Sequence, residues 1–349
     1  MNKREWLLKV FSGEDTGRVP VGFWFHFLKG SEMSGALQDP SLIEKNLDGH
    51  RRYNEAFHPD FVKAMSDGLF YRPLETFPDM HCAHDLASVR PLKRDHPYFN
   101  ACVDLAQQIR RIFGDDILIY YNVPAPFHHV IKKYNGTTVM HTLPSCITED
   151  PEAFRIANDA LVTDMITLSE RVMTEGTMDG IYLSLHNDNV FSTELYEEFI
   201  KDGELALLQA ANAIHSYNIA HICGFAGRVN NFDVYKDYPA AVFNWSLHTT
   251  HLSIQEGKQF FDSCTCVIGG FDQIPGSLIH KGSREEIRRF VFDLLNVNGS
   301  AGFILGADCT IPSDTPAEHL IWAREACREW EKGDHALHSN SNNACYASI

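Results

Sequence analysis

Short apolar runs alternate with longer amphipathic stretches along most of the chain. The longer stretches repeat apolar residues every three or four positions, which is the spacing of one helix face. Repeated alternation of strand and helix is typical of a parallel sheet whose strands are joined by crossover helices. The short runs predict strands at Val19–Phe25, Ile117–Val123, Gly180–Leu185, Ile219–Cys223, Ala241–Trp245, Cys266–Gly269 and Phe303–Leu305. We therefore predict an α/β fold.

Capping residues mark where several of the predicted helices begin. Ser283 is followed three residues later by Glu286, the spacing of a capping box in which each side chain bonds to the other residue's backbone N–H. Pro316 stands in the first turn of another helix, where a missing N–H leaves no helical bond unmade. The apolar spacing predicts long helices over Glu152–Thr174, Thr193–Tyr217, Arg284–Leu295 and Leu320–Trp330.

The choice among parallel α/β folds depends on nucleotide-binding motifs. No G-x-G-x-x-G follows the first predicted strand, and no G-x-x-x-x-G-K-[ST] occurs, so an open doubly wound sheet has no support. We predict a (β/α)8 TIM barrel, formed by residues 1–332 as a single domain with an N-terminal helical extension. Residues 333–349 are polar and rich in Asn and Ser, which favours a flexible C-terminal tail.

Charge and composition exclude several classes of function. The net charge of −16 argues against a broad nucleic-acid-binding face and against adsorption to anionic membranes, because both need clustered Lys and Arg. No apolar stretch approaches the roughly 20 residues that span a bilayer. The apolar patch near the N-terminus is short and is broken by Lys9, so we expect an amphipathic helix and a cytoplasmic protein. The nine cysteines are an odd number, which argues against a disulfide framework.

Three metal-ligand types follow two of the predicted strands. His221 and Cys223 are two residues apart in an extended segment, so their side chains point to the same side. Cys309 comes shortly after the strand Phe303–Leu305, and both segments leave the carboxyl ends of strands, where barrel enzymes carry their chemistry. One imidazole and two thiolates would leave one position of a tetrahedral zinc ion open, as in reactive zinc sites. A thiol bound there would lose its proton and become a nucleophile.

The same residues also admit a purely structural interpretation. A His beside a small apolar Cys is common by chance in a protein core and needs no metal. Two further clusters contain ligand types, namely Cys264 with Cys266 and Cys82 with its neighbouring histidines. The former pair lies in an apolar run that favours core packing, and the latter lies in a predicted loop.

Other polar residues that follow predicted strands are candidates for substrate binding. In a barrel such positions are functional, although polar turns also cap the following helix. Asp308 is in addition a candidate acceptor for the N–H of an imidazole. The candidates are His26, His186, Asp188, Asp272, Gln273 and Asp308.

Several segments together resemble the uroporphyrinogen decarboxylase superfamily and, within it, the corrinoid-dependent zinc methyltransferases. The segments are Arg18–Val21, Met178–Ile181, His221–Gly224, Cys266–Asp272 and Gly302–Pro312. The resemblance implies a (β/α)8 barrel that moves a methyl group between a methylated corrinoid and a thiol such as coenzyme M. It implies that His221, Cys223 and Cys309 are the Zn²⁺ ligands and the catalytic centre.

The resemblance also defines the alternatives. The decarboxylase branch has an Arg-rich N-terminal motif that binds the carboxylates of a tetrapyrrole, whereas Val19–Leu28 contains no Arg. Decarboxylation without metal is therefore the second hypothesis, and a non-catalytic barrel that binds a corrinoid or a partner is the third. The chain lacks a D-x-H-x-x-G stretch, so we expect methylcobamide to come from a separate corrinoid protein or free in solution. Exposed apolar helix faces in a barrel of this kind would suit a homodimer.

Overall fold

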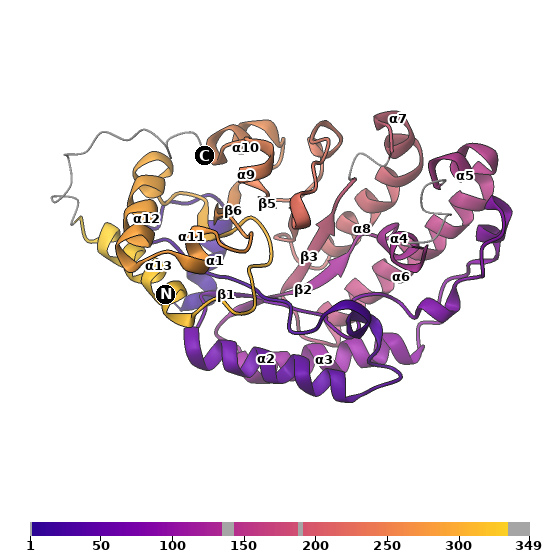
Figure 1. Ribbon diagram of the computed structural model, residues 1–349, viewed down its shortest axis with the longest axis horizontal. Helices are drawn as coiled ribbons and strands as arrows, with labels where there is room; N and C mark the ends of the chain where they lie inside the picture. The colour runs from indigo at the N-terminus through magenta and orange to yellow at the C-terminus, as the bar shows by residue number, and fades with distance from the viewer. Residues whose placement is uncertain (1, 135–142, 188–190, 334–349) are drawn as a thin grey trace.

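Seven parallel strands form one sheet in the order in which they occur along the chain, and helices surround them (Figure 1). The computed structural model describes residues 2–134, 143–187 and 191–333. The predicted tail, apart from Gly333, and Asp188 therefore lie outside the described residues. The strands are β1 (Phe61–Ala64), β2 (Leu118–Pro124), β3 (Gly180–Leu185), β4 (Ile219–Ile222), β5 (Val242–Trp245), β6 (Cys266–Phe271) and β7 (Phe303–Ala307).

The predicted strand Val19–Phe25 is not a regular strand. It forms an isolated parallel bridge between Val21 and Leu305 of β7. On its other side the Val21 carbonyl accepts from the Asp60 N–H, just before β1, but the Val21 N–H donates to the Asp60 side chain. The Asp60 carboxylate thus takes the place of a backbone acceptor, and no regular ladder of hydrogen bonds forms between this segment and β1. The extended segment nevertheless lies between β7 and β1, the position of an eighth strand, so the TIM-barrel prediction is confirmed with seven strands rather than eight.

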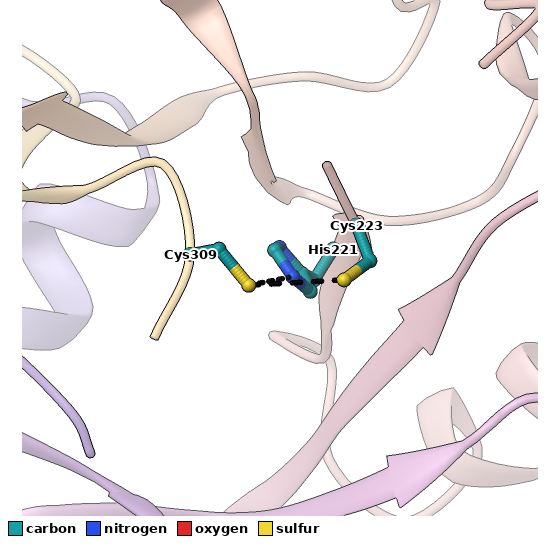
Figure 2. A group of neighbouring side chains, drawn as sticks. All are labelled: His221, Cys223 and Cys309. Atoms are coloured by element: carbon teal, nitrogen blue, oxygen red, sulfur yellow. Dashed lines mark hydrogen bonds between the residues drawn. The ribbon is translucent and has the colours of Figure 1, made fainter. Parts of the chain in front are cut away.

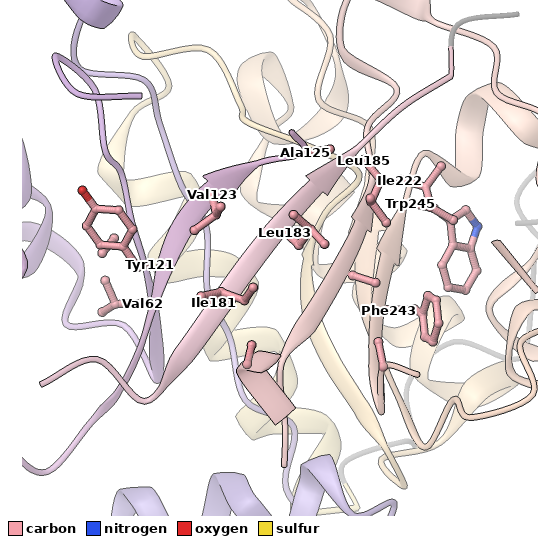
Figure 3. Close-up of a cluster of buried hydrophobic side chains, with 14 of the residues drawn as sticks. Val62, Tyr121, Val123, Ala125, Ile181, Leu183, Leu185, Ile222, Phe243 and Trp245 are labelled. Carbon is pink, nitrogen blue, oxygen red and sulfur yellow. The ribbon is translucent and has the colours of Figure 1, made fainter. Parts of the chain in front are cut away.

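Alternating side chains of the strands build two separate cores. Outward side chains such as Val123, Leu183 and Phe243 pack beneath the surrounding helices (Figure 3). Inward side chains such as Tyr182 and Ile268 form a second cluster inside the barrel. The apolar face of the N-terminal helix joins this inner cluster through Trp6, Leu7, Val10 and Phe11, so the helix is part of the barrel core.

Most helices begin within a few residues of their predicted positions, but one helix ends earlier than predicted and contains a π-helical segment. The predicted helix Thr193–Tyr217 divides into α7, a π-helical segment at Glu197–Lys201 and α8, which ends at Asn212. Beyond α8 the Asn218 amide donates to the His215 carbonyl and to the Asn212 side chain, which holds the chain in a turn before β4. None of the described helices combines the length and apolarity needed to cross a membrane.

The helices outside the sheet have the following bounds: α1 (Lys3–Phe11), α2 (Ser41–Phe57), α3 (Pro97–Phe113), α4 (His128–Tyr134), α5 (Leu143–Glu149), α6 (Pro151–Thr174), α7 (Thr193–Tyr196), α8 (Asp202–Asn212), α9 (Leu247–Thr250), α10 (Ile254–Phe260), α11 (Leu278–Lys281), α12 (Arg284–Asn298) and α13 (Ala317–Glu331). The predicted capping box at the start of α12 is present, with Ser283 and Glu286 bonding to each other's backbone N–H. The loops that follow the strands carry the residues of the candidate site.

Candidate active site

Three side chains from the ends of β4 and β7 meet inside the barrel (Figure 2). His221 belongs to β4, Cys223 follows that strand directly, and Cys309 comes two residues after β7. The Cys309 sulfur lies 3.4 Å from His221 Nε2 and 3.7 Å from the Cys223 sulfur. His221 and Cys309 are buried, and Cys223 is partly exposed to a cavity.

The spacing of these donor atoms fits a tetrahedral zinc ion. Ligands bound to zinc at 2.0–2.3 Å and at tetrahedral angles lie about 3.5–3.8 Å from one another. The sulfur–nitrogen and sulfur–sulfur distances agree with that spacing, and all three donor atoms lie within 4.8 Å of each other. The same three side chains line the cavity, so a ligand in the cavity would be able to reach a fourth position.

The two thiols of the site differ strongly in acidity. A hydrogen bond with Cys223, together with the ammonium of Lys63, lowers the pKa of Cys309 to about 7. The same hydrogen bond and burial raise the pKa of Cys223 to about 12. Cys309 therefore holds the first negative charge. Cys223 keeps its proton and donates a hydrogen bond to the Cys309 sulfur. A metal ion that displaced this proton would convert both residues into ligands.

A cavity of about 820 Å³ opens beside the three side chains. Its charged lining is mainly cationic, although the whole chain is acidic. Apolar and aromatic groups such as Phe70, Tyr71 and Phe225 form much of the remaining wall. Such a lining suits a ligand with apolar surface and some negative charge. The charged residues are Lys29, Lys63, Lys132, Arg228 and Asp314.

Three of the predicted substrate-binding residues line this cavity, namely His26, His186 and Gln273. The His26 imidazole lies 2.9 Å from the carboxylate of Asp67. The Gln273 amide approaches the Gly224 carbonyl next to the Cys223 loop at 3.5 Å. The structure therefore brings these candidates to the same chamber as the cysteines.

The neighbours of His186 fix the orientation and the tautomer of its imidazole. Its ring stacks on His128 with centroids 3.5 Å apart, and Arg228 Nη1 lies 3.1 Å from its Nε2. Arginine only donates hydrogen bonds, so Nε2 must be the acceptor and the imidazole is neutral with its proton on Nδ1.

Asp272 and Asp308 do not line the cavity and belong to a separate group with His248. Asp308 accepts hydrogen bonds from the Nδ1 and the backbone N–H of His248, at 2.9 and 3.0 Å. Asp308 is therefore hydrogen-bonded to an imidazole, but this imidazole is that of His248 and not that of His221. The His221 Nδ1 has no hydrogen-bond partner among the described residues. Asp272 contributes to the same group as His248 and Asp308, whose possible ligand atoms lie within 4.8 Å of one another.

Several residues of the chamber do not follow from the sequence pattern. Lys63 of β1 and the polar side chains of Asn122 and Ser184 line it, and the Tyr182 ring contacts His221 at 5.5 Å between ring centroids. A signal for Lys63 was present, because a lysine stands inside the apolar run from Phe61 to Met65. Among the described residues, neither Cys264 with Cys266 nor Cys82 with His81 and His84 belongs to a group of three or more possible metal ligands.

Comparison with known proteins places the chain in a family. It matches the uroporphyrinogen decarboxylase (URO-D) family model over residues 64–330. No curated protein matches it significantly. Among solved structures it is similar to a methyltransferase from Methanosarcina mazei, with a TM-score of 0.71 and 16% identity over 95% of this chain and 99% of that one.

It is also similar to a B12-independent methionine synthase from a Shewanella species, solved in complex with selenomethionine. The TM-score is 0.55 and the identity 14%, over 90% of this chain and 99% of that chain. At these identities the likeness concerns the fold, which agrees with the barrel described above. The family match spans most of the chain, and the protein belongs to the uroporphyrinogen decarboxylase family.

Proposed function

We propose that this protein is a zinc-dependent methyltransferase that transfers a methyl group from a methylated corrinoid to a thiol. The observation that carries the proposal is the tetrahedral spacing of one imidazole nitrogen and two sulfurs on a cavity wall. Three protein ligands leave a fourth position for a substrate, which distinguishes reactive from structural zinc sites. The structural likeness to a methyltransferase supports the same reaction class.

The residues of the chain have separate roles in this proposal. His221, Cys223 and Cys309 would hold the ion, and bound zinc supplies the Lewis acidity that keeps a thiol deprotonated at neutral pH. In the transfer, the substrate sulfur forms a bond to the methyl carbon while the cobalt–carbon bond breaks, and the corrinoid retains that electron pair. Phe70 and Phe225 give part of the cavity wall an apolar surface against which a ligand would pack.

The substrate contacts fall to residues around the site. His26, His186 and Gln273 line the chamber and offer polar groups for orientation. Asp188 remains a proposed substrate-binding residue, whereas Asp272 and Asp308 do not line the cavity. A separate corrinoid protein, approaching the mouth of the cavity, would deliver methylcobamide. Methyl donors other than a corrinoid are a further outcome of the test, because one structural neighbour is a B12-independent synthase.

The first test is the zinc content of purified protein, compared with Cys223→Ala and with a matched control. We expect about one zinc per chain in the wild type and none in Cys223→Ala, because two remaining ligands bind weakly. Cys102→Ala removes a buried thiol of α3 outside the site and is expected to keep the zinc.

The activity test uses thiol-dependent demethylation of methylcobalamin by the same three proteins. Wild type and Cys102→Ala are expected to react, and Cys223→Ala or chelator-treated protein to lose at least a hundredfold in rate. Transfer by metal-free protein would refute the mechanism. Loss of carboxyl groups from uroporphyrinogen without zinc would instead favour the decarboxylase, and tight corrinoid binding without turnover would favour a non-catalytic barrel.

A further inference from the structure

Lys63 places a positive charge in the interior of the barrel. It belongs to β1, only 5% of the residue is exposed, and it lines the same cavity as His221, Cys223 and Cys309. Lysines are almost never fully buried unless something compensates their charge. The charge of Lys63 therefore needs an explanation that the fold alone does not provide.

No carboxylate pairs with this ammonium group. Among the described residues, Lys63 Nζ has neither an ion pair nor a hydrogen bond, and its close neighbours are aromatic: the Tyr182 ring at 4.1 Å and the Trp24 ring at 5.4 Å. Asp67, the carboxylate that acts on it electrostatically, already accepts bonds from His26 and from two backbone N–H groups. Cation–π contacts recover only part of the hydration that the ammonium loses.

One aromatic ring connects Lys63 with the candidate metal centre. Tyr182 contacts the ammonium, and the same ring lies 5.5 Å from the His221 imidazole. The two cysteines are the strongest charges that favour the protonated lysine. Burial lowers the pKa of Lys63 to about 8, so the ammonium form still predominates at neutral pH. The barrel thus holds a cation in the same cavity as the two cysteines, and among the described residues no carboxylate is bonded to it.

The charge of the loaded centre explains why a cation belongs there. Two cysteine thiolates neutralise a divalent metal ion, and a substrate thiolate in the fourth position would give the centre a net charge of −1. We propose that Lys63 is the counter-ion of the His221–Cys223–Cys309 centre and compensates this charge when a thiolate binds. This inference rests on the proposed function. Lys63 is then a positioning residue that acts through charge and makes no bond to the substrate.

The role predicts how substitutions change the affinity of the metal-loaded centre for a thiolate. This affinity would be measured at fixed pH in cobalt-substituted protein, from thiolate–cobalt charge-transfer absorption during titration with a thiol. We expect Lys63→Met to weaken thiolate binding about tenfold to a hundredfold, while zinc affinity stays close to that of wild type because the centre without a substrate thiolate is neutral. Lys63→Arg keeps the charge and is expected to stay within about threefold of wild type. Lys258→Met, which removes a half-buried lysine of α10 outside the cavity, is the matched control and is expected to bind normally.

A structural role for Lys63 would give a different pattern. Replacing an unpaired buried charge by an apolar side chain of similar length is often neutral or stabilising. Metal-free Lys63→Met is therefore expected to melt at the same temperature as wild type or higher, while its metal-loaded form binds thiols more weakly. A lower melting temperature in both Lys63→Met and Lys63→Arg, with equal losses of affinity, would overturn the inference.

A last experiment distinguishes a counter-ion of the metal centre from a residue that binds a charged group of the substrate. Binding of 2-mercaptoethanol and of 3-mercaptopropionate would be followed by thiolate–cobalt charge-transfer absorption in cobalt-substituted protein. A counter-ion predicts that Lys63→Met weakens both thiols by the same factor. A loss confined to 3-mercaptopropionate would overturn the inference and identify a carboxylate-binding residue. A wild-type protein that binds no metal would refute the proposed function itself, whereas normal thiol binding by metal-loaded Lys63→Met would refute only the role of Lys63.

Discussion

At the scale of the residue, Glu204 shows how the fold controls a proton far from the candidate site. Its carboxylate is buried on α8 and accepts hydrogen bonds of 2.6 Å from the hydroxyls of Tyr196 and Tyr238. Burial raises the pKa of Glu204 to about 7, and the two hydroxyls offset part of that rise. The unfolded chain ionises near pH 4.5, so between these values only the folded protein keeps the proton.

This difference predicts the pH dependence of stability. The contribution of Glu204 is fully present below about pH 4.5 and is lost as the pH rises to about 7, a change on the order of 3 kcal/mol. Relative to Glu204→Gln, wild type should therefore lose stability between pH 5 and pH 8, as measured by urea unfolding. The exposed Glu152→Gln serves as the control. An equal pH dependence of wild type and Glu204→Gln would contradict the prediction.

At the scale of the element, the start of α12 depends on one capping box. The Ser283 N–H donates to the Glu286 carboxylate at 2.8 Å, and the Ser283 hydroxyl accepts from the Glu286 N–H. Ser283→Ala should lower the free energy of unfolding by about 1 kcal/mol, because the helix loses a cap. Ser283→Asp should retain most of this free energy, because an Asp side chain also caps a helix. The exposed Ser31→Ala controls for loss of a hydroxyl, and an effect of the same size there would exclude a capping role.

At the scale of the whole molecule, a bound ion would join two strands that are distant in sequence. β4 and β7 would be tied through His221, Cys223 and Cys309, so zinc is expected to stabilise the folded state, by about 2.7 kcal/mol at a hundredfold excess over the dissociation constant. Thermal unfolding with zinc and with a chelator measures this. Cys309→Ala should lose the response, whereas Cys327→Ala, at a buried thiol of α13, should keep it. A zinc response in Cys309→Ala would place the binding site elsewhere.

Some features of the fold and the candidate site follow directly from local sequence. The boundaries of α6 and α12 agree with apolar spacing and capping residues, and His221 and Cys223 face the same side because they are two residues apart in an extended segment. The strand expected at Val19–Phe25 failed because a side chain, that of Asp60, takes up the N–H of Val21. A pattern of apolar residues does not show which partner an N–H will find.

The sequence by itself determined the alternation of strands and helices, the helix caps and the set of candidate ligands. These features depend on the periodicity of the backbone and on residues a few positions apart, which the order of amino acids specifies directly. Only the tertiary structure decided that Cys309 meets His221, that Asp308 binds His248, and that Lys63 shares the chamber with both cysteines. Those contacts arise when the sheet curls and brings the inward positions of β1, β4 and β7 around one interior, a condition that depends on long-range packing.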